Sequence, residues 1–301
     1  MTRSISRHLP FFLVLALSGT LLWRAGALAD GIRAGLSLSV TAVIPAIFPF
    51  AVLSPYLQTL PLAPREKKGL FSRVFRLPTA AVLPLFVGLV CGFPLGAKVT
   101  RDGYSAGLYT KEEAERILCF ANNPSIAFVV LGVGKNLRGR MLDGVILFAV
   151  EVLVSLIIAL ILSLLTKTPR EEDSARPLPH VTPPHLTQAM RDAVSASLTV
   201  TGFIAFFSGL LAVLKTFLPT AAYLAAAALM EVGAACAALA PLAGGLVPCG
   251  FAICFSGLSV AMQTAAMLDG TDLSLRRAFF WKIVSGILGS AMTYGALLIF
   301  S

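Results

Sequence analysis

The stretch "CGFPLGAKVTRDGYSAGLYTKEEAERILCFANNPSIAFVVLGVG", residues 91–134, combines features that a simple membrane-spanning helix does not have. It begins with glycines and a proline in apolar surroundings and passes through a charged segment. It then returns to apolar sequence that carries Asn122-Asn123-Pro124. A proline inside a helix removes a backbone hydrogen bond, and at membrane depth the freed carbonyls need partners or a wet cavity. Asparagine side chains can serve either need, so this stretch predicts an interrupted helix.

The composition of the whole chain indicates a membrane protein. Of its 301 residues, 57% are hydrophobic and only 13% are charged, and the mean hydropathy is +0.85. Soluble domains are about 45–50% apolar and about 25% charged. Several segments reach the roughly 20 apolar residues that a spanning helix needs. The formal net charge of +9 therefore points to loop residues that set membrane orientation and not to nucleic-acid binding.

The sequence argues against several classes of enzyme. The three histidines, His8, His180 and His185, lie outside every apolar segment, so an intramembrane hydrolase would lack its usual general base. No nucleotide-binding P-loop pattern occurs. The cysteines lie in apolar runs without a C-x-x-C pair, which favours packing roles over disulfides or metal ligands; they are Cys91, Cys119, Cys236, Cys249 and Cys254. We expect no catalytic residue, metal site or cofactor.

The chain divides into four parts. Residues 1–29 have a basic start, an apolar run and the sequence Ala27-Leu28-Ala29, which predicts a transmembrane signal anchor, with signal-peptide cleavage as the alternative. Residues 30–166 form a first repeat, which includes a basic, interfacial amphipathic segment at 62–78. Residues 167–189 are polar and proline-rich and predict a cytoplasmic linker. Residues 190–301 form a second repeat.

Each repeat has the same predicted order of a span, a re-entrant hairpin, an interrupted helix and a further span. The segments are 31–57, 79–97, 110–134 and 141–166 in the first repeat and 190–217, 219–244, 246–268 and 275–300 in the second. Gly92, Pro94 and Gly96 are expected to shape the tip of the first hairpin. Thr110 to Glu113 matches a capping box, which marks a helix start.

The topology predicts an inverted repeat. A hairpin returns to its own side of the membrane, so each repeat crosses three times and the two repeats face opposite ways, as in secondary transporters. A short sequence match at an offset of 160 residues supports the duplication: Ser37-Leu38 aligns with Ser197-Leu198. With the N-terminus in the cytoplasm, most of the 24 Lys and Arg residues lie on the inside. Lys135, Arg138 and Arg140 fit this orientation poorly, because they share one short outer loop.

Polar residues at the two interrupted helices are the candidate site for a solute. In the first repeat they are Asn122, Asn123 and Ser125. In the second, Ser256 and Ser259 flank Gly257, and Gln263 follows Ser259 by one helical turn. Interrupted helices that meet at mid-membrane form substrate sites in transporters, whereas polar residues that only pack helices together are the alternative.

Three charged residues in or beside apolar segments receive separate interpretations. Glu231 lies in the middle of "ALMEVGAACAA", and an acid at such a position is a functional hypothesis by default, for a solute, a cation or a proton. A neutral, hydrogen-bonded structural role is its alternative. Glu151 is expected to be a structural partner of a residue on a neighbouring helix. Lys98 is expected to extend to the cytoplasmic surface, with anion binding as the less favoured interpretation.

The motifs resemble those of the YlbJ-type sporulation integral membrane protein family, in the nucleoside-recognition (Gate) domain superfamily. They are G-F-P-L-G-A-K at 92–98, Y-T-K-E-E-A at 109–114, Asn122-Asn123, "FRLPTAA" at 75–81, and, more loosely, "LMEVGAA" and "FSGLSVAMQT" at 229–235 and 255–264. The resemblance spans about residues 30–300. It implies an inverted-repeat membrane fold with paired hairpins and a role in spore formation. A nucleoside substrate would rest on the superfamily name alone.

From these observations we expect an all-α integral membrane protein of the cell membrane that moves or senses a small polar solute during sporulation. Its partners would be the lipid bilayer, the solute, and a coupling cation or proton; a homo-oligomer is left open. The alternative is a non-transporting scaffold at the spore septum, in which the basic segment at 62–78 binds lipid headgroups or a partner protein.

Overall fold

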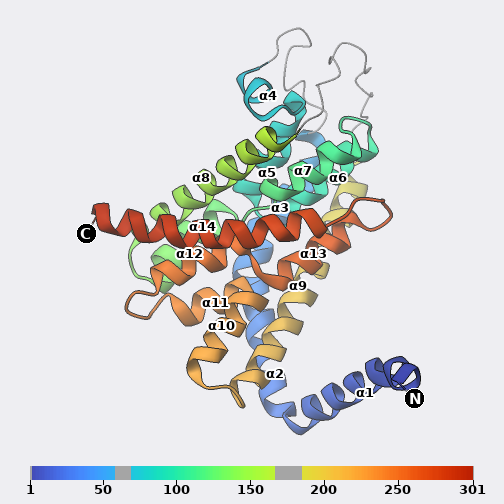
Figure 1. Ribbon diagram of the computed structural model, residues 1–301, viewed down its shortest axis with the longest axis vertical. Helices are drawn as coiled ribbons and strands as arrows, with labels where there is room; N and C mark the ends of the chain where they lie inside the picture. Colours follow the sequence, from blue (N-terminus) through green and yellow to red (C-terminus); the bar gives the residue numbers. More distant parts are fainter. Residues whose placement is uncertain (1, 58–68, 167–184, 301) are drawn as a thin grey trace.

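The computed structural model describes residues 2–57, 69–166 and 185–300, and every regular element in these ranges is helical (Figure 1). The N-terminal half contains α1 (Thr2–Trp23), α2 (Ala25–Leu38), η1 (Ser39–Val43), α3 (Ile44–Leu57), α4 (Leu70–Phe75), η2 (Thr79–Ala81), α5 (Val82–Cys91), α6 (Leu95–Ser105), α7 (Lys111–Ala121), η3 (Ala127–Leu137) and α8 (Met141–Leu165). The C-terminal half contains α9 (Leu186–Lys215), α10 (Thr220–Met230), α11 (Val232–Leu239), α12 (Leu246–Phe255), α13 (Gly257–Leu268) and α14 (Arg276–Phe300).

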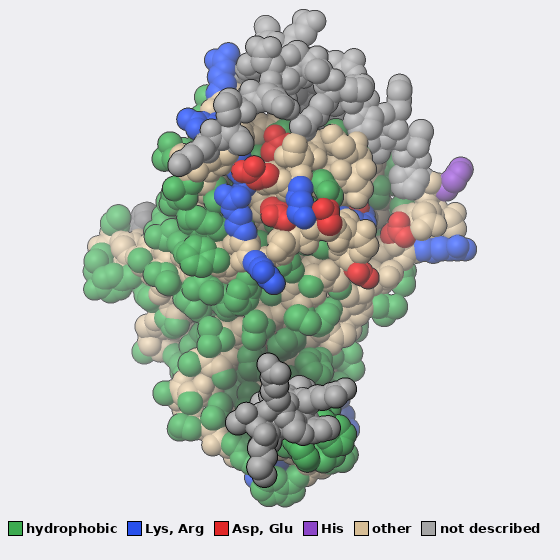
Figure 2. All heavy atoms as spheres, turned by 45° about the vertical axis from the view of Figure 1, so that its right-hand side comes forward, with side chains coloured by type: hydrophobic (Ala, Val, Ile, Leu, Met, Phe, Trp, Pro, Cys, Tyr) green, Lys and Arg blue, Asp and Glu red, His purple; other side chains and the backbone are tan. Residues whose placement is uncertain are grey.

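Five segments within the described ranges are long and apolar enough to cross a bilayer: Ala25–Leu57, Met141–Leu165, Leu186–Lys215, Leu246–Leu268 and Arg276–Ile299. Large apolar side chains on them point outward, for example Leu164, which is 69% exposed, and Leu198, which is 64% exposed. Figure 2 shows charged side chains gathered in the upper part of one face and hydrophobic side chains over much of the rest. Such a surface suits lipid, so the chain is a multi-pass, all-α membrane protein.

The N-terminal region contains two helices that meet at residue 24. Helix α1 ends at Trp23, and α2 begins at Ala25, so "AGALAD" is helical and belongs to the next element. Among the residues whose side chains are described, Val14–Trp23 is an apolar helix shorter than the five candidate spans. In Figure 1, α1 points away from the body of the molecule. The domain boundary at residue 29 stays a prediction.

The two helices that open the halves, α2 and α9, pack against each other in antiparallel directions. Gly31 lies against Gly209 and Ser208, and Gly35 lies against Ala205 and Ser208. A β-carbon at Gly31 would come within 2.9 Å of the α-carbon of Gly209. Small residues allow such close approach of helices in membranes. Above this contact, η1 is a π-helical turn just before Pro45, where the helix must adjust to proline.

Each half contains a pair of short helices that are joined by a tight connection and pack against each other. The pairs are α5 with α6 and α10 with α11. The α5–α6 pair extends to Ser105, beyond the predicted end of the first hairpin at residue 97. Lys98 is consequently buried within α6, where its ammonium lies 2.7 Å from the carboxylate of Asp102. The expected extension of Lys98 to the surface is wrong, because a carboxylate one turn away pairs with it.

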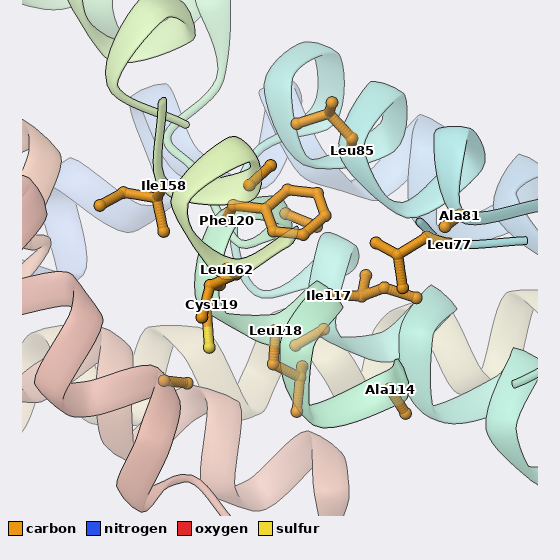
Figure 3. Packing of buried hydrophobic residues seen from close by; sticks show 14 of the residues in the cluster. Leu77, Ala81, Leu85, Ala114, Ile117, Leu118, Cys119, Phe120, Ile158 and Leu162 are labelled. Atoms are coloured by element: carbon orange, nitrogen blue, oxygen red, sulfur yellow. The ribbon is translucent and has the colours of Figure 1, made fainter. Parts of the chain in front are cut away.

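Buried clusters draw on helices from both halves. Figure 3 shows Phe120 of α7 and Ile158 of α8 in one cluster. This cluster also includes Cys254 of α12 and Ala278 of α14. A second joins η3 to α10, α11 and α12, and a third joins α3, α5 and α6 to α9. All five cysteines are buried and free, as expected for packing residues.

Two of the polar contacts between the halves, here called tethers, involve the loops that precede α14 and α8. After α13, Asp272 accepts hydrogen bonds from the hydroxyl of Tyr104, at 2.7 Å, and from the ammonium of Lys111, at 3.0 Å. Before α8, Arg138 donates to the carbonyls of Ala240 and Leu242, at 2.7 and 3.3 Å. In both cases the loop before the last helix of one half binds the end of a short helix in the other.

The second tether involves the basic loop of Lys135, Arg138 and Arg140, whose positive charge fits the predicted orientation poorly. Arg138 also pairs with buried Asp143 at 3.0 Å, and Arg140 lies 3.9 Å from the same carboxylate. At least Arg138 is therefore held by structural contacts.

The predicted interfacial segment and linker are covered only in part. Residues 62–68 and 167–184 lie outside the described residues. The described remainder of the first segment contains α4. Its last carbonyls, those of Phe75 and Arg76, accept hydrogen bonds from Arg116 of α7 at 2.9 and 3.3 Å. Arg116 is 2% exposed, so this basic residue has a structural role.

Candidate functional site

The helix that carries the asparagines is interrupted where the sequence predicts it. Thr110 and Glu113 form the expected capping box at the start of α7. The helix ends at Ala121, and η3 begins at Ala127. Pro124 lies in the gap, because it cannot supply the amide hydrogen that a continuous helix needs. Ser125 then accepts a hydrogen bond from the amide of Phe128 at 3.2 Å, which caps the start of the second segment.

The two asparagines have different partners. Asn122 is 5% exposed, and its side-chain nitrogen donates to the hydroxyl of Thr264 in α13 at 2.7 Å. Its side-chain oxygen has no hydrogen-bond partner among the described residues. Asn123 is fully buried and fully engaged: it donates to the carbonyl of Phe120 and accepts from Ser155 and Lys282. The side-chain oxygen of Asn122 therefore has no partner among the described residues, whereas that of Asn123 accepts two hydrogen bonds.

The turn of the first short helix pair lies directly against this interruption. A β-carbon at Gly92 would come within 3.0 Å of Ser125, and one at Gly88 or Gly96 would collide with the carbonyl oxygen of Ala121. Gly92 also has a φ of +88°, which favours glycine. Pro94 follows as the residue before α6. The absence of side chains at Gly92 and Gly96 therefore lets the turn lie close to the interrupted backbone.

Glu231 lies at the interruption between α10 and α11. Its backbone is extended, and its carboxylate accepts hydrogen bonds from the amides of Gly233, at 3.0 Å, and Ala234, at 2.5 Å. Glu231 thus caps the N-terminus of α11, where the helix dipole favours a negative charge. At 2% exposure, both oxygens already have partners. Its coupling role and its neutral state both stay predictions, and the hydrogen bonds give Glu231 a helix-capping contact.

A further interruption lies at Ser256, between α12 and α13. Ser256 has a φ of +72°, and its hydroxyl donates to the carbonyl of Ile253 at 3.0 Å. A β-carbon at Gly257 would come within 3.2 Å of the backbone of Met230 and Glu231, so the two interruptions of this half touch. One turn later, Gln263 donates to Ser259 at 3.2 Å, as their spacing predicts. The side-chain oxygen of Gln263 has no partner among the described residues.

The structure brings some candidate residues together and keeps others apart. Asn122 meets Thr264, which is adjacent in sequence to Gln263, whereas the backbone of Glu231 lies beside Gly257. Within the described ranges, no hydrogen bond joins either asparagine to Glu231. All seven predicted site residues are at most 5% exposed. Two surface pockets, one between α10 and α12 and one along the start of α9, contain none of them.

Sequence reasoning misses two residues of this region. No pattern singles out Thr264, and charge counting places Lys282 among the loop cations. The ammonium of Lys282 instead lies 3.1 Å from the side-chain oxygen of Asn123 and 3.8 Å from Glu151. The second contact gives Glu151 a neighbour on another helix, as predicted, at a distance longer than a hydrogen bond. The lone lysine in "FFWKIV", five residues after the Arg276-Arg277 pair, is the signal that could have identified it.

Comparison with curated proteins finds a relative that is similar over part of the chain. The chain is 32% identical over 129 residues to the sporulation integral membrane protein YlbJ of Bacillus subtilis strain 168. The match covers 41% of this chain and 31% of that protein, so the matched part is less than a third of the relative's length. No protein-family model matches the chain, and no solved structure does. The predicted resemblance to the YlbJ type is confirmed by this match.

Proposed function

Taking this similarity to a YlbJ-type sporulation integral membrane protein as the premise, we propose that the chain binds and moves a small polar solute across the membrane during sporulation. The observation that carries the proposal is the contact between the two interrupted helices. Asn122 bonds Thr264 there, and the side-chain oxygens of Asn122 and Gln263 remain without partners among the described residues. Buried polar atoms normally have hydrogen-bond partners, so these two side-chain oxygens are the acceptors available to a solute.

The proposal includes an inverted repeat, with α5–α6 and α10–α11 as re-entrant hairpins and an N-terminus in the cytoplasm. Several packing relations support it. The opening helices α2 and α9 run antiparallel, α14 packs on α7 as α12 packs on α8, and α13 packs on α6 as η3 packs on α11. The two tethers, at Asp272 and Arg138, also join equivalent loops. Transporters with this plan place solute sites where interrupted helices meet.

In this proposal Asn122 and Gln263 bind the solute directly, because each has a free oxygen. Asn123, Ser125 and Ser256 hold the interrupted backbone in place, since their side chains bond to it or to neighbouring helices. Ser259 orients Gln263. The low exposure of these residues is that of a closed site, which would have to open toward one side of the membrane for a solute to enter.

Flux into proteoliposomes tests the proposal. We would compare uptake of uridine, adenosine, glutamine and glucose by the wild type, Asn122→Ala and Gln263→Ala. Gln188→Ala and Asn136→Ala are matched controls, because both residues are exposed. We expect uptake of at least one solute, reduced roughly tenfold in the two site variants and unchanged in the controls.

Spore formation separates transport from the scaffold alternative, which the internal engagement of Asn123 and Glu231 favours. The same variants would be returned to a spore-forming strain that lacks the gene, and heat-resistant spores would be counted. A transporter predicts few spores from Asn122→Ala at normal protein level. Normal spore counts from both site variants, together with absence of flux, would support the scaffold.

A further inference from the structure

A buried charged cluster lies beside Asn123, and the proposed solute contacts do not use it. The ammonium of Lys282 in α14 lies 3.1 Å from the side-chain oxygen of Asn123 and 3.8 Å from one carboxylate oxygen of Glu151 in α8. The Glu151 side chain is 1% exposed and that of Lys282 is 12% exposed. The cluster thus joins the first interruption to the last helices of both halves.

The geometry of this cluster differs from that of a stabilising ion pair. A buried ion pair offsets its desolvation cost only with close contact and additional hydrogen bonds to both groups. Here the charged atoms lie 3.8 Å apart, and the short contact of Lys282 is to a neutral amide. The second carboxylate oxygen of Glu151, Oε2, has no hydrogen-bond partner among the described residues.

The surroundings of Glu151 contain few other titratable groups. Lys282 faces it from α14, and the thiol of Cys254 faces it from α12. From α7 come Asn123 and, near Lys282, the thiol of Cys119. Among the described residues, η3 and α4 contribute no charged side chain to these contacts. Glu151 lies near the middle of the 25-residue helix α8, a depth at which ionisable residues mark proton and ion pathways.

We propose that Glu151 is a proton-binding site and that Lys282 links its charge to the first helix interruption through Asn123. A proton from water forms an O–H bond at Oε2 of Glu151, and that bond breaks when the proton returns to water. Before protonation, Lys282 contacts both the negatively charged carboxylate of Glu151 and the side-chain oxygen of Asn123. Protonation of Glu151 removes that negative charge. Asn123 also donates a 2.8 Å hydrogen bond to the carbonyl of Phe120. A change in the contact between Lys282 and Asn123 therefore affects the backbone beside Asn122.

The proton site at Glu151 would serve to couple solute movement to a proton, and only this purpose rests on the proposed function. Proton binding itself can be measured without any solute. The full-length protein in lipid nanodiscs would be titrated in an infrared cell between about pH 5 and about pH 9, with proton as the only probe. We expect a protonated-carboxyl band that changes with pH in the wild type and is lost in Glu151→Gln.

Glu231→Gln is the matched control, because Glu231 is equally buried but bonded through both oxygens to backbone amides. We expect it to retain the pH-dependent band. A band that survives Glu151→Gln, that is absent from the wild type, or that disappears in Glu231→Gln would overturn the inference.

A second variant covers the case in which Glu151→Gln leaves Lys282 unpaired and the protein does not fold. Glu151→Gln combined with Lys282→Gln removes both charges, and loss of the band from this folded variant would support the inference equally. If the band behaves as expected while no solute is transported, the proton site stands and the transport proposal fails. Solute flux without any pH-dependent band would leave the transport proposal standing and reject the proton site.

Discussion

The side-chain nitrogen of Asn122 donates a 2.7 Å hydrogen bond to the hydroxyl of Thr264, which lies 142 residues further along the chain. The same hydroxyl donates its only proton to the carbonyl of Val260 at 2.7 Å, so it can only accept from Asn122. This fixes the orientation of the asparagine amide and leaves its oxygen free among the described residues. The interrupted helix of the N-terminal half is thereby bonded to α13.

A double-mutant cycle on Asn122→Ala and Thr264→Val should detect this bond. We expect a coupling energy of roughly 0.6–1 kcal/mol, as for other interhelical hydrogen bonds in membrane proteins. The measurement is chemical unfolding in detergent micelles. Strictly additive effects of the two substitutions would contradict the assignment.

Gly96→Ala should prevent proper packing of the α5–α6 turn. The new β-carbon would collide with the carbonyl oxygen of Ala121, and backbone cannot move as a flexible side chain does. We expect the free energy of unfolding to fall by about 3 kcal/mol or more. The destabilised protein should then aggregate, which size-exclusion chromatography detects. Gly202→Ala is the control, because nothing lies within 4 Å of its β-carbon and alanine favours helix. Equal behaviour of the two variants would refute the close contact.

Arg138→Ala should destabilise the protein more than Arg140→Ala. Arg138 bonds two carbonyls beyond α11 and pairs with Asp143 at 3.0 Å, whereas the Arg140 side chain is 69% exposed and 3.9 Å from the same carboxylate. We expect the free energy of unfolding to fall by about 2 kcal/mol in Arg138→Ala and by less than about 0.5 kcal/mol in Arg140→Ala. Unfolding in detergent measures both, and a reversed order would argue against the tether.

The tether at Asp272 should weaken in acid. Hydrogen bonds from Tyr104 and Lys111, and the positive charge of Lys111, hold the pKa of Asp272 below its ordinary value of 3.8. A carboxyl with a lowered pKa stabilises the folded state above its ordinary pKa and loses this effect as pH falls through the lowered value. We therefore expect the wild type to unfold at a higher temperature than Asp272→Asn at neutral pH.

The difference between the two proteins should shrink as the pH falls below 3.8. Thermal unfolding curves across this range provide the measurement. A constant difference at all pH values would mean that the charge of Asp272 does not maintain the tether.

Local sequence signals predicted much of this fold. The capping box at Thr110 identified the start of α7, and Pro124 identified the interruption, because each acts on its own neighbouring backbone. Gly92 and Gly96 marked a turn for the same reason. The partners were harder to predict: Thr264 for Asn122, and Lys282 for Asn123, lie more than 140 residues away.

Lys282 shows why composition alone misplaced a functional candidate. It follows two arginines closely, so charge counting assigned it to a loop, whereas the helix carries it inward to Asn123. Glu231 shows the converse. A buried acid suggests a functional group, but a break in the backbone gives it two amides to cap, and no sequence pattern marks that break in advance.

The way α14 packs against both α7 and α8 has a consequence for synthesis. When the ribosome has made the N-terminal half and the translocon has inserted it, Glu151 and Asn123 are already at membrane depth, but Lys282 does not yet exist. The nascent chain must hold these polar groups in place, through local water or transient contacts, until α14 emerges. Insertion of the first half is therefore provisional, and the arrival of α14 completes it.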